Sequence, residues 1–210
     1  MLVPVQLGLR QAVIDRRPET VAALAAQFTR ERRLLLPGLL GPDLLATIWR
    51  RLEDATFVTR VATRVHPPAI DQKLVDPVLL GSLHFLLNDA AVVEFVRRVS
   101  AQEVTGFVGA VYRLEPGGGH RDSWHSDLDG NRRAGLTVNL SRQPFAGGEL
   151  QLRARGAADD VLWTVANTGP GDGLLFPIGD DVEHCIRPIE GSHPKTALAG
   201  WFCLDPDLKL

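Results

Sequence analysis

Two histidines and one aspartate in this chain have the side chains and the spacing to bind a single metal ion. His125 and Asp127 are separated by one residue, and His184 lies far downstream. Two histidines with one carboxylate are the facial ligand set of non-haem Fe(II) sites, which leave the opposite face of the metal open. In an extended strand residues i and i+2 point to the same face, so His125 and Asp127 could aim at one ion while Ser126 points away. A neighbouring strand would then have to supply His184.

This spacing is weak evidence when it is taken alone. Short motifs have high false-positive rates, and the simpler interpretation is a pair of surface polar residues with a histidine near a turn. His120 and Asp122 have the same spacing, so spacing by itself leaves them open as a rival pair. The rest of the chain must therefore decide whether His125 and Asp127 belong to a site.

Lys195 is a second residue that could do chemistry. It precedes an apolar stretch near the end of the chain, and lysine is seldom buried in a strand unless it is paired. A buried lysine could hold the distal carboxylate of a dicarboxylate cosubstrate. The alternative is a solvated strand end, so the residue type alone leaves both interpretations open.

The composition is that of an ordinary globular protein. The chain has 210 residues, 45% hydrophobic and 23% charged, with a formal net charge of −2. This suits one domain, and a nucleic-acid partner is not expected because binders of nucleic acid usually show a basic face. The only cysteines are Cys185 and Cys203, which favours a reduced, cytoplasmic protein. No run of about 18 apolar residues predicts a transmembrane helix, and residues 1–10 lack the pattern of a signal peptide.

The hydrophobic pattern divides the chain into two halves. Residues 1–103 are predicted to be mostly helical, with helices over 19–32, 43–54, 77–87 and 90–99 and short strands over 33–36 and 57–65. From residue 104 the period changes, and Gly, Pro, Asn and Asp clusters separate strands over 105–114, 135–141, 149–153, 161–165, 173–178, 183–189 and 196–204. We therefore predict a single α+β, mainly β domain over 1–210. A jelly-roll core over 104–204 would carry the N-terminal helices on one sheet.

The second half resembles the Fe(II)/2-oxoglutarate dioxygenases of the prolyl 4-hydroxylase-like group. The resemblance covers roughly residues 104–202, and its strength lies in the order of its pieces. These pieces are Tyr112, His125-Ser126-Asp127, Thr137-Val138-Asn139-Leu140, Gly147-Gly148-Glu149-Leu150, Gly171-Asp172-Gly173-Leu174-Leu175-Phe176, His184, Pro188, Gly191, Lys195 and Gly200-Trp201-Phe202. The resemblance implies a double-stranded β-helix, or cupin-like jelly roll, that uses Fe(II), 2-oxoglutarate and O₂.

The resemblance also implies roles for single residues. His125, Asp127 and His184 would bind Fe(II) and form the catalytic centre. Lys195 would pair with the C5 carboxylate of 2-oxoglutarate at a position where the family often has arginine. The gap between His184 and Lys195 is longer than usual, which we assign to an insertion near Ser192-His193. A carboxylate at Asp127 favours hydroxylation, because related halogenases have a small residue there.

Further residues are expected around the cosubstrate and the substrate. Tyr112 and Asn139 fall where the family places side chains that contact the cosubstrate. Thr137 shares a strand face with Asn139, so it is also expected to line the pocket. Two loops could cover the metal, one over 117–124 and one over 64–68, and they offer Trp124, Arg121 and His66 as substrate-binding residues. Simple solvation of these loops is an equally good interpretation.

The function predicted from the sequence is hydroxylation of an unactivated C–H bond in a peptide, amino acid or small natural product, with release of succinate and CO₂. Two alternatives stay open: a non-catalytic jelly-roll binding or sensor protein, and a nucleic-acid demethylase of the same superfamily. The demethylase would need a basic groove around the site. The arginines that could form such a groove are Arg132, Arg133, Arg153 and Arg155. The sequence does not indicate the oligomeric state, and no membrane partner is expected.

Overall fold

Two facing β-sheets with helices on one side form the fold. The computed structural model describes residues 3–63, 67–117, 119–120, 122–157, 160–166 and 168–206. Four helices are present in these residues, α1 (Pro18–Glu31), α2 (Pro42–Glu53), α3 (Pro77–Leu87) and α4 (Ala90–Ser100). Each has a proline at its first turn or an aspartate before it. At α3, for example, Asp76 accepts hydrogen bonds from the backbone amides of Val78 and Leu79.

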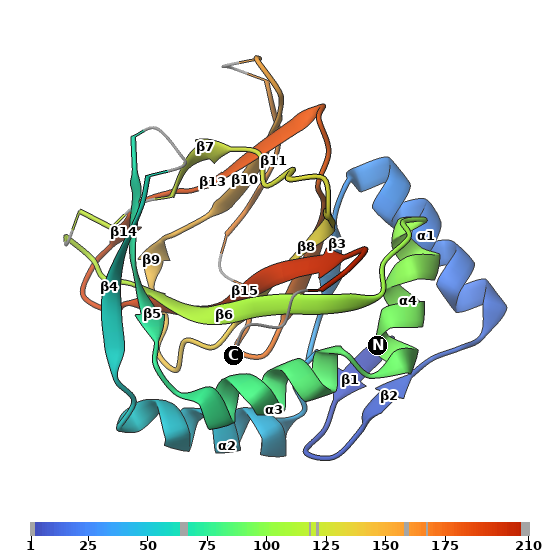
Figure 1. Ribbon diagram of the computed structural model, residues 1–210, viewed down its shortest axis with the longest axis horizontal. Helices are drawn as coiled ribbons and strands as arrows, with labels where there is room; N and C mark the ends of the chain where they lie inside the picture. The colour runs from blue at the N-terminus through green and yellow to red at the C-terminus, as the bar shows by residue number, and fades with distance from the viewer. Residues whose placement is uncertain are drawn as a thin grey trace.

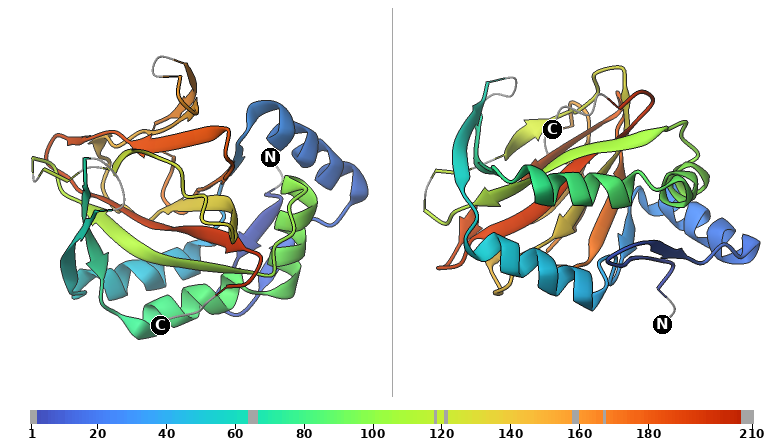
Figure 2. Two further views of the ribbon diagram at one scale, coloured as in Figure 1. Left: turned by 45° about the horizontal axis from the view of Figure 1, so that its top comes forward. Right: turned by 60° about the horizontal axis from the view of Figure 1, so that its bottom comes forward.

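The large sheet has seven strands in the order β3-β12-β8-β15-β6-β5-β4. Their bounds are β3 (Leu34–Leu36), β12 (Gly173–Pro177), β8 (Arg132–Asn139), β15 (Lys195–Cys203), β6 (Gly106–Leu114), β5 (Ala69–Leu74) and β4 (Phe57–Ala62). All of its pairings are antiparallel. The helices lie on the side of this sheet that faces away from the second sheet (Figures 1 and 2).

The second sheet has four strands in the order β11-β10-β13-β7. Their bounds are β11 (Val161–Val165), β10 (Leu150–Ala154), β13 (Val182–Ile186) and β7 (Asp122–His125). Two short ribbons complete the fold, β1 (Val5–Leu7) with β2 (Ala12–Ile14) and β9 (Ala146–Gly147) with β14 (Ile189–Glu190).

Two apolar clusters hold these layers together. The larger one joins the helices to the large sheet and includes Ile48, Leu83 and Phe107. The smaller one lies between the two sheets, where Leu152 and Phe176 pack with four further residues. Burial of apolar surface is the main stabilising contribution in both. Only part of the space between the sheets is filled in this way, and the rest forms the cavity described below.

The predicted α+β jelly-roll fold with helices on one sheet is confirmed, and most predicted elements agree within a few residues. The strands β1, β2, β5, β7 and β9 fall outside the strand ranges predicted from the sequence. It placed His184 at the start of a strand, whereas it is the third residue of β13. The N-terminal half also contributes β3, β4 and β5 to the large sheet, so its role includes a cavity wall as well as helical support.

The helices can also be compared with the length of a membrane span. Among the described residues, no single helix has the length and apolar character to cross a membrane; only α3 and α4 taken together, with a 60° bend between them, reach that length and composition.

Candidate metal centre and cosubstrate cavity

Two neighbouring strands of the small sheet bring His125 and His184 together. β7 pairs antiparallel with β13, and His125 lies opposite His184 in this register. The centroids of the two imidazole rings are 4.4 Å apart. Phe176, from the large sheet, packs edge-on against His184 at 5.2 Å and supports the ring from the other side of the cavity. The fold thus joins two histidines that are far apart in sequence.

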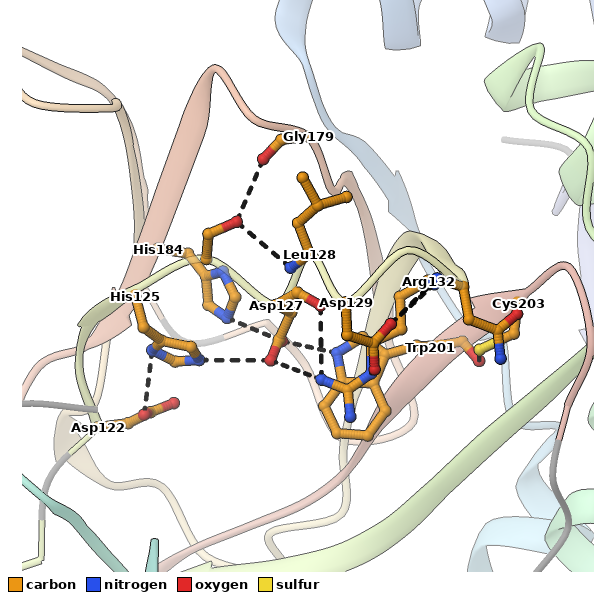
Figure 3. A network of polar contacts seen from close by, with 12 residues as sticks. Asp122, His125, Asp127, Leu128, Asp129, Arg132, Gly179, His184, Trp201 and Cys203 are labelled. Atoms are coloured by element: carbon orange, nitrogen blue, oxygen red, sulfur yellow. Dashed lines mark hydrogen bonds and ion pairs between the residues drawn. The ribbon is translucent and has the colours of Figure 1, made fainter. Parts of the chain in front are cut away.

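Asp127 lies two residues beyond the end of β7 and completes a converging set (Figure 3). Its Oδ1 is 3.6 Å from Nε2 of His125, and its Oδ2 is 3.4 Å from Nε2 of His184. Ligand atoms about 2 Å from one ion lie roughly 3 Å from each other, so these three groups fit a metal after a small contraction. The Nδ1 atom of His125 contacts the carbonyl oxygen of Ser123 at 2.7 Å, which leaves Nε2 for the metal.

The electrostatics of this set favour a cation. Burial acts to raise the pKa of Asp127, but contacts with His125 and His184 outweigh it and hold that pKa well below its ordinary range. Burial acts to lower the pKa of His125, but Asp127 and Asp122 raise it to about 9. Without a metal, a proton on His125 therefore balances the buried carboxylate. A metal ion would displace that proton.

Asp122 is a second carboxylate at this centre, and the sequence indicates it only as the partner of His120 in the rival pair. Its Oδ1 lies 3.4 Å from Nδ1 of His125. Ligand atoms of Asp122, His125 and His184 also lie within 4.8 Å of one another, so by distance alone they form a rival ligand set. Burial raises the pKa of Asp122. His120, the rival histidine by spacing, instead accepts a hydrogen bond from the backbone amide of Glu115 at its Nδ1.

The two carboxylates differ in their other partners. Asp127 receives hydrogen bonds from Arg132 at Oδ1, at 3.0 Å, and from the indole of Trp201 at Oδ2, at 2.6 Å. The sequence indicates Arg132 only as part of a possible basic groove and indicates no site role for Trp201. An arginine five residues after an aspartate has no recognisable spacing signal, because the contact depends on how β8 follows the intervening loop.

Lys195 lies in the same cavity as the metal-binding candidates. The cavity measures about 480 Å³. Along β15, Lys195, Ala197, Ala199 and Trp201 line it, as the two-residue period of a strand requires. The alternate residue Leu198 belongs to the core on the helix side. The two small alanines between Lys195 and Trp201 leave room for a ligand.

The charge of Lys195 is not neutralised by any described side chain. Its Nζ donates to the carbonyl oxygen of Gly148 at 2.6 Å and lies 5.9 Å from the ring centroid of Phe145. No carboxylate among the described residues lies within ion-pair distance of it. Burial lowers the pKa of Lys195 to about 8, although Asp122 and Glu149 act to raise it. A buried, unpaired ammonium group is unfavourable and favours an anionic ligand.

The residues expected around the cosubstrate lie in two places. Tyr112 and Thr137 line the same cavity as Lys195. Tyr112 is stacked against the Arg60 guanidinium at 4.7 Å, and burial raises its pKa. Asn139 lines a small adjoining cavity, where its amide bonds the backbone of Thr168 and Ser141. A direct contact of Asn139 with the cosubstrate therefore stays a prediction.

The residues expected to bind substrate are placed less fully. Arg121 and His66 lie outside the described residues. Trp124 is described, and the guanidinium of Arg153 lies over its ring at 4.2 Å; Trp124 is not among the residues that line the cavity. Part of the cavity wall comes from β4 and β5, where Arg60 and Asp71 form an ion pair that no pattern in the sequence indicates.

Comparison with known proteins finds a family model that matches the second half of the chain. Residues 109–203 match the model of the 2OG-Fe(II) oxygenase superfamily, and this stretch contains all three metal-ligand candidates and Lys195. These residues belong to the 2OG-Fe(II) oxygenase superfamily. Its enzymes use Fe(II), 2-oxoglutarate and O₂, as expected for this chain. No curated protein matches the sequence.

Solved structures with a similar fold cover most of this chain. A prolyl-4-hydroxylase from Pseudomonas putida has 22% identity and a TM-score of 0.65, and covers 88% of this chain and 99% of its own. A prolyl hydroxylase from Trichoplax adhaerens, in complex with a hypoxia inducible factor peptide, has 15% identity and a TM-score of 0.68, over 88% and 89%. The epimerase SnoN from nogalamycin biosynthesis has 14% identity and a TM-score of 0.64, over 89% and 84%. At these identities the likeness is one of fold.

Proposed function

We propose that this chain is a 2OG-Fe(II) oxygenase that hydroxylates an unactivated C–H bond of a peptide, an amino acid or a small natural product, with release of succinate and CO₂. The observation that carries the proposal is one cavity that holds two histidines, a carboxylate and an unneutralised lysine. A metal ion would bind the two histidines and the carboxylate, and a dicarboxylate would pair with the lysine. One of the similar structures is a prolyl hydroxylase in complex with a peptide, and another is an epimerase from nogalamycin biosynthesis. These two structures support keeping both peptides and small natural products as substrate classes.

In this proposal His125, Asp127 and His184 hold Fe(II), and Lys195 binds the C5 carboxylate of 2-oxoglutarate. When bound, the iron supplies the oxidising chemistry, and the protein orients the reactants and excludes water. Tyr112 and Thr137 would line the cosubstrate site, and the apolar residues between the sheets would keep it dry.

Asp127 is the better candidate than Asp122 for the third ligand. Its carboxylate faces Nε2 of both histidines, whereas Asp122 faces Nδ1 of His125, which already contacts Ser123. A carboxylate at this position occupies the place that an added anion would need at the metal. This supports hydroxylation as the outcome.

Neither alternative function has equal support. A binding or sensor protein would not need the intact set of ligands together with a free cation for the cosubstrate. For a nucleic-acid demethylase, three of the four arginines are engaged by acids: Arg132 by Asp127 and Asp129, and Arg153 and Arg155 by Glu183. Of these arginines, only Arg132 lines the cavity, and its guanidinium is paired with two carboxylates. The cytoplasmic location stays a prediction from the cysteine content.

The proposed activity can be tested without knowing the substrate. Purified protein with Fe(II), ascorbate, 2-oxoglutarate and O₂ should form succinate, faster when a library of peptides and small metabolites contains the substrate. The substrate itself should gain about 16 Da, one oxygen atom. The matched control is His184→Ala, which should remove both signals. Iron binding at His125, Asp127 and His184 without any turnover of 2-oxoglutarate would instead favour the binding or sensor protein.

We expect the affinity for 2-oxoglutarate to fall as the pH rises above about 8. The pKa of Lys195 is lowered to about 8, so the ammonium group that attracts the C5 carboxylate is present below that pH and is lost above it. The Kd should therefore be constant below pH 8 and rise by up to tenfold per pH unit above it. Calorimetric titration of anaerobic Mn(II)-loaded protein between pH 6.5 and 9.5 would measure this. Lys195→Arg, which stays charged throughout, should give a flat profile; the same rise in that variant would contradict the explanation.

A further inference from the structure

The carboxylate of Asp127 is bound from two directions by side chains of the large sheet. Arg132 Nη1 donates to Oδ1 at 3.0 Å, and Trp201 Nε1 donates to Oδ2 at 2.6 Å (Figure 3). Arg132 is the first residue of β8, and Trp201 lies in β15. The histidines, in contrast, belong to the small sheet. Asp127 therefore links the two sheets at the metal centre.

The two donors are themselves held in place. The Arg132 guanidinium lies 3.5 Å above the centroid of the Trp201 ring, and its Nε is 3.2 Å from Oδ2 of Asp129. A planar guanidinium stacked on an aromatic ring keeps a fixed direction for its N–H groups. Trp201 is anchored in turn by β15, which is paired on both sides. The donors are thus oriented by contacts that do not involve a metal.

We propose that Arg132 and Trp201 form a preorganised two-donor clamp for a monoanion, which Asp127 occupies, and that they are positioning residues for the iron ligand. This inference rests on the proposed function, because it takes Asp127 as a ligand. Each donor binds one oxygen of the carboxylate, so the clamp fixes the plane of the group while lone pairs on both oxygens still face the histidines. Asp122 has no contact of this kind with either donor, which explains why one of two nearby carboxylates would serve the metal.

The clamp makes a prediction about metal binding that does not depend on turnover. Groups that orient a metal ligand typically account for about 10- to 100-fold in metal affinity. Trp201→Phe keeps the ring and removes only the N–H donor, and Arg132→Gln removes the charged fork. Each should raise the Kd for Co(II), a spectroscopic substitute for Fe(II), by about 10- to 100-fold and change the visible spectrum of the bound ion. Arg132→Lys should recover only part of the affinity, because lysine lacks the fork.

Matched controls separate this role from general damage to the fold. Trp49→Phe also removes an indole donor, which binds the carbonyl oxygen of Leu140 at 3.0 Å away from the cavity. Arg97→Gln removes an exposed ion pair with Glu103. Both should bind Co(II) like the native protein. Thermal unfolding of each variant identifies any that fails to fold.

A second experiment keeps the clamp intact and removes its occupant. Asp127→Ala leaves two donors aimed at an empty space the size of a carboxylate, so added formate should restore part of the lost Co(II) affinity. Pivalate has the same charged group on a bulky chain and should not. The formate effect should disappear in the double variant Asp127→Ala/Trp201→Phe. The rescue itself is measured in Asp127→Ala, which retains both Arg132 and Trp201, so it does not depend on whether variants of these two residues fold.

The outcomes distinguish the clamp from the proposed function. If Asp127→Ala binds Co(II) as tightly as the native protein, Asp127 is not a ligand, and the ligand set of the proposed function is wrong. If Asp127→Ala loses Co(II) but the Arg132 and Trp201 variants retain native affinity and spectrum, only the clamp is wrong. Formate rescue that persists without the Trp201 donor would also overturn the clamp.

Discussion

Asp127→Asn should weaken Fe(II) binding by more than about 100-fold and abolish succinate formation, whereas Asp122→Asn should retain iron within about tenfold. Both changes keep the size of the side chain and remove one negative charge. The loss should be larger at Asp127 because it faces Nε2 of both histidines at 3.6 and 3.4 Å. The loss of Fe(II) affinity at Asp127 should also exceed the 10- to 100-fold loss that is typical when a group that only orients a ligand is removed.

The pair of variants decides between the two possible ligand sets. Anaerobic titration with Fe(II) gives the affinities, and succinate is measured under saturating 2-oxoglutarate. A small loss at Asp122 would agree with its 3.4 Å contact to Nδ1 of His125, which helps to orient the ring. The reverse order of losses would assign the metal to Asp122, His125 and His184, and would remove Asp127 from the site.

Lys195→Ala should raise the Kd for 2-oxoglutarate by roughly 10- to 150-fold and leave the affinity for Fe(II) unchanged. A hydrogen bond to a charged group contributes about 1.5–3 kcal/mol, which converts to that range. Lys195 is the cavity cation without a described carboxylate partner, and the backbone oxygen of Gly148 already orients its Nζ. Equal losses for iron and cosubstrate would contradict its assigned role.

A shortened ligand provides the matched control for this prediction. 2-Oxobutyrate keeps the 2-oxo acid group that would chelate iron but lacks the distal carboxylate. It should bind the native protein and Lys195→Ala with the same weak affinity, because neither complex contains the ion pair. A loss of 2-oxobutyrate affinity in the variant would mean that Lys195 shapes the cavity in general, and that its charge is not directed at the C5 carboxylate.

The fold could be predicted largely from local patterns. The helices at α1, α2 and α4 follow from a proline or capping residue and an apolar stripe, and both signals act within a few residues. Most strands from β6 onward follow from turn residues and alternation. The missed strands have weaker patterns: β5 includes the polar run Asp71-Gln72-Lys73, which is a strand because β4 and β6 pair with it.

The candidate site was predictable where it depends on residue type and periodicity. Lys195 and Trp201 share a face of β15 because they are an even number of residues apart. The same rule placed His125 and Asp127 together, although β7 ends at His125 and the Asp127 side chain is held by Arg132 and Trp201. The position of Asp127 thus agrees with the prediction while its physical cause differs.

The sequence by itself determined the jelly-roll class and the candidate residues for a metal and an anionic cosubstrate, because these depend on residue chemistry and on periods of two and 3.6 residues. Only the tertiary structure decided which groups converge. The register of β7 against β13 places His125 opposite His184, and the approach of the large sheet gives Asp127 its two donors and leaves Asp122 without them. Such contacts join distant segments through backbone pairing and packing, so they cannot be predicted from the spacing of residues along the chain.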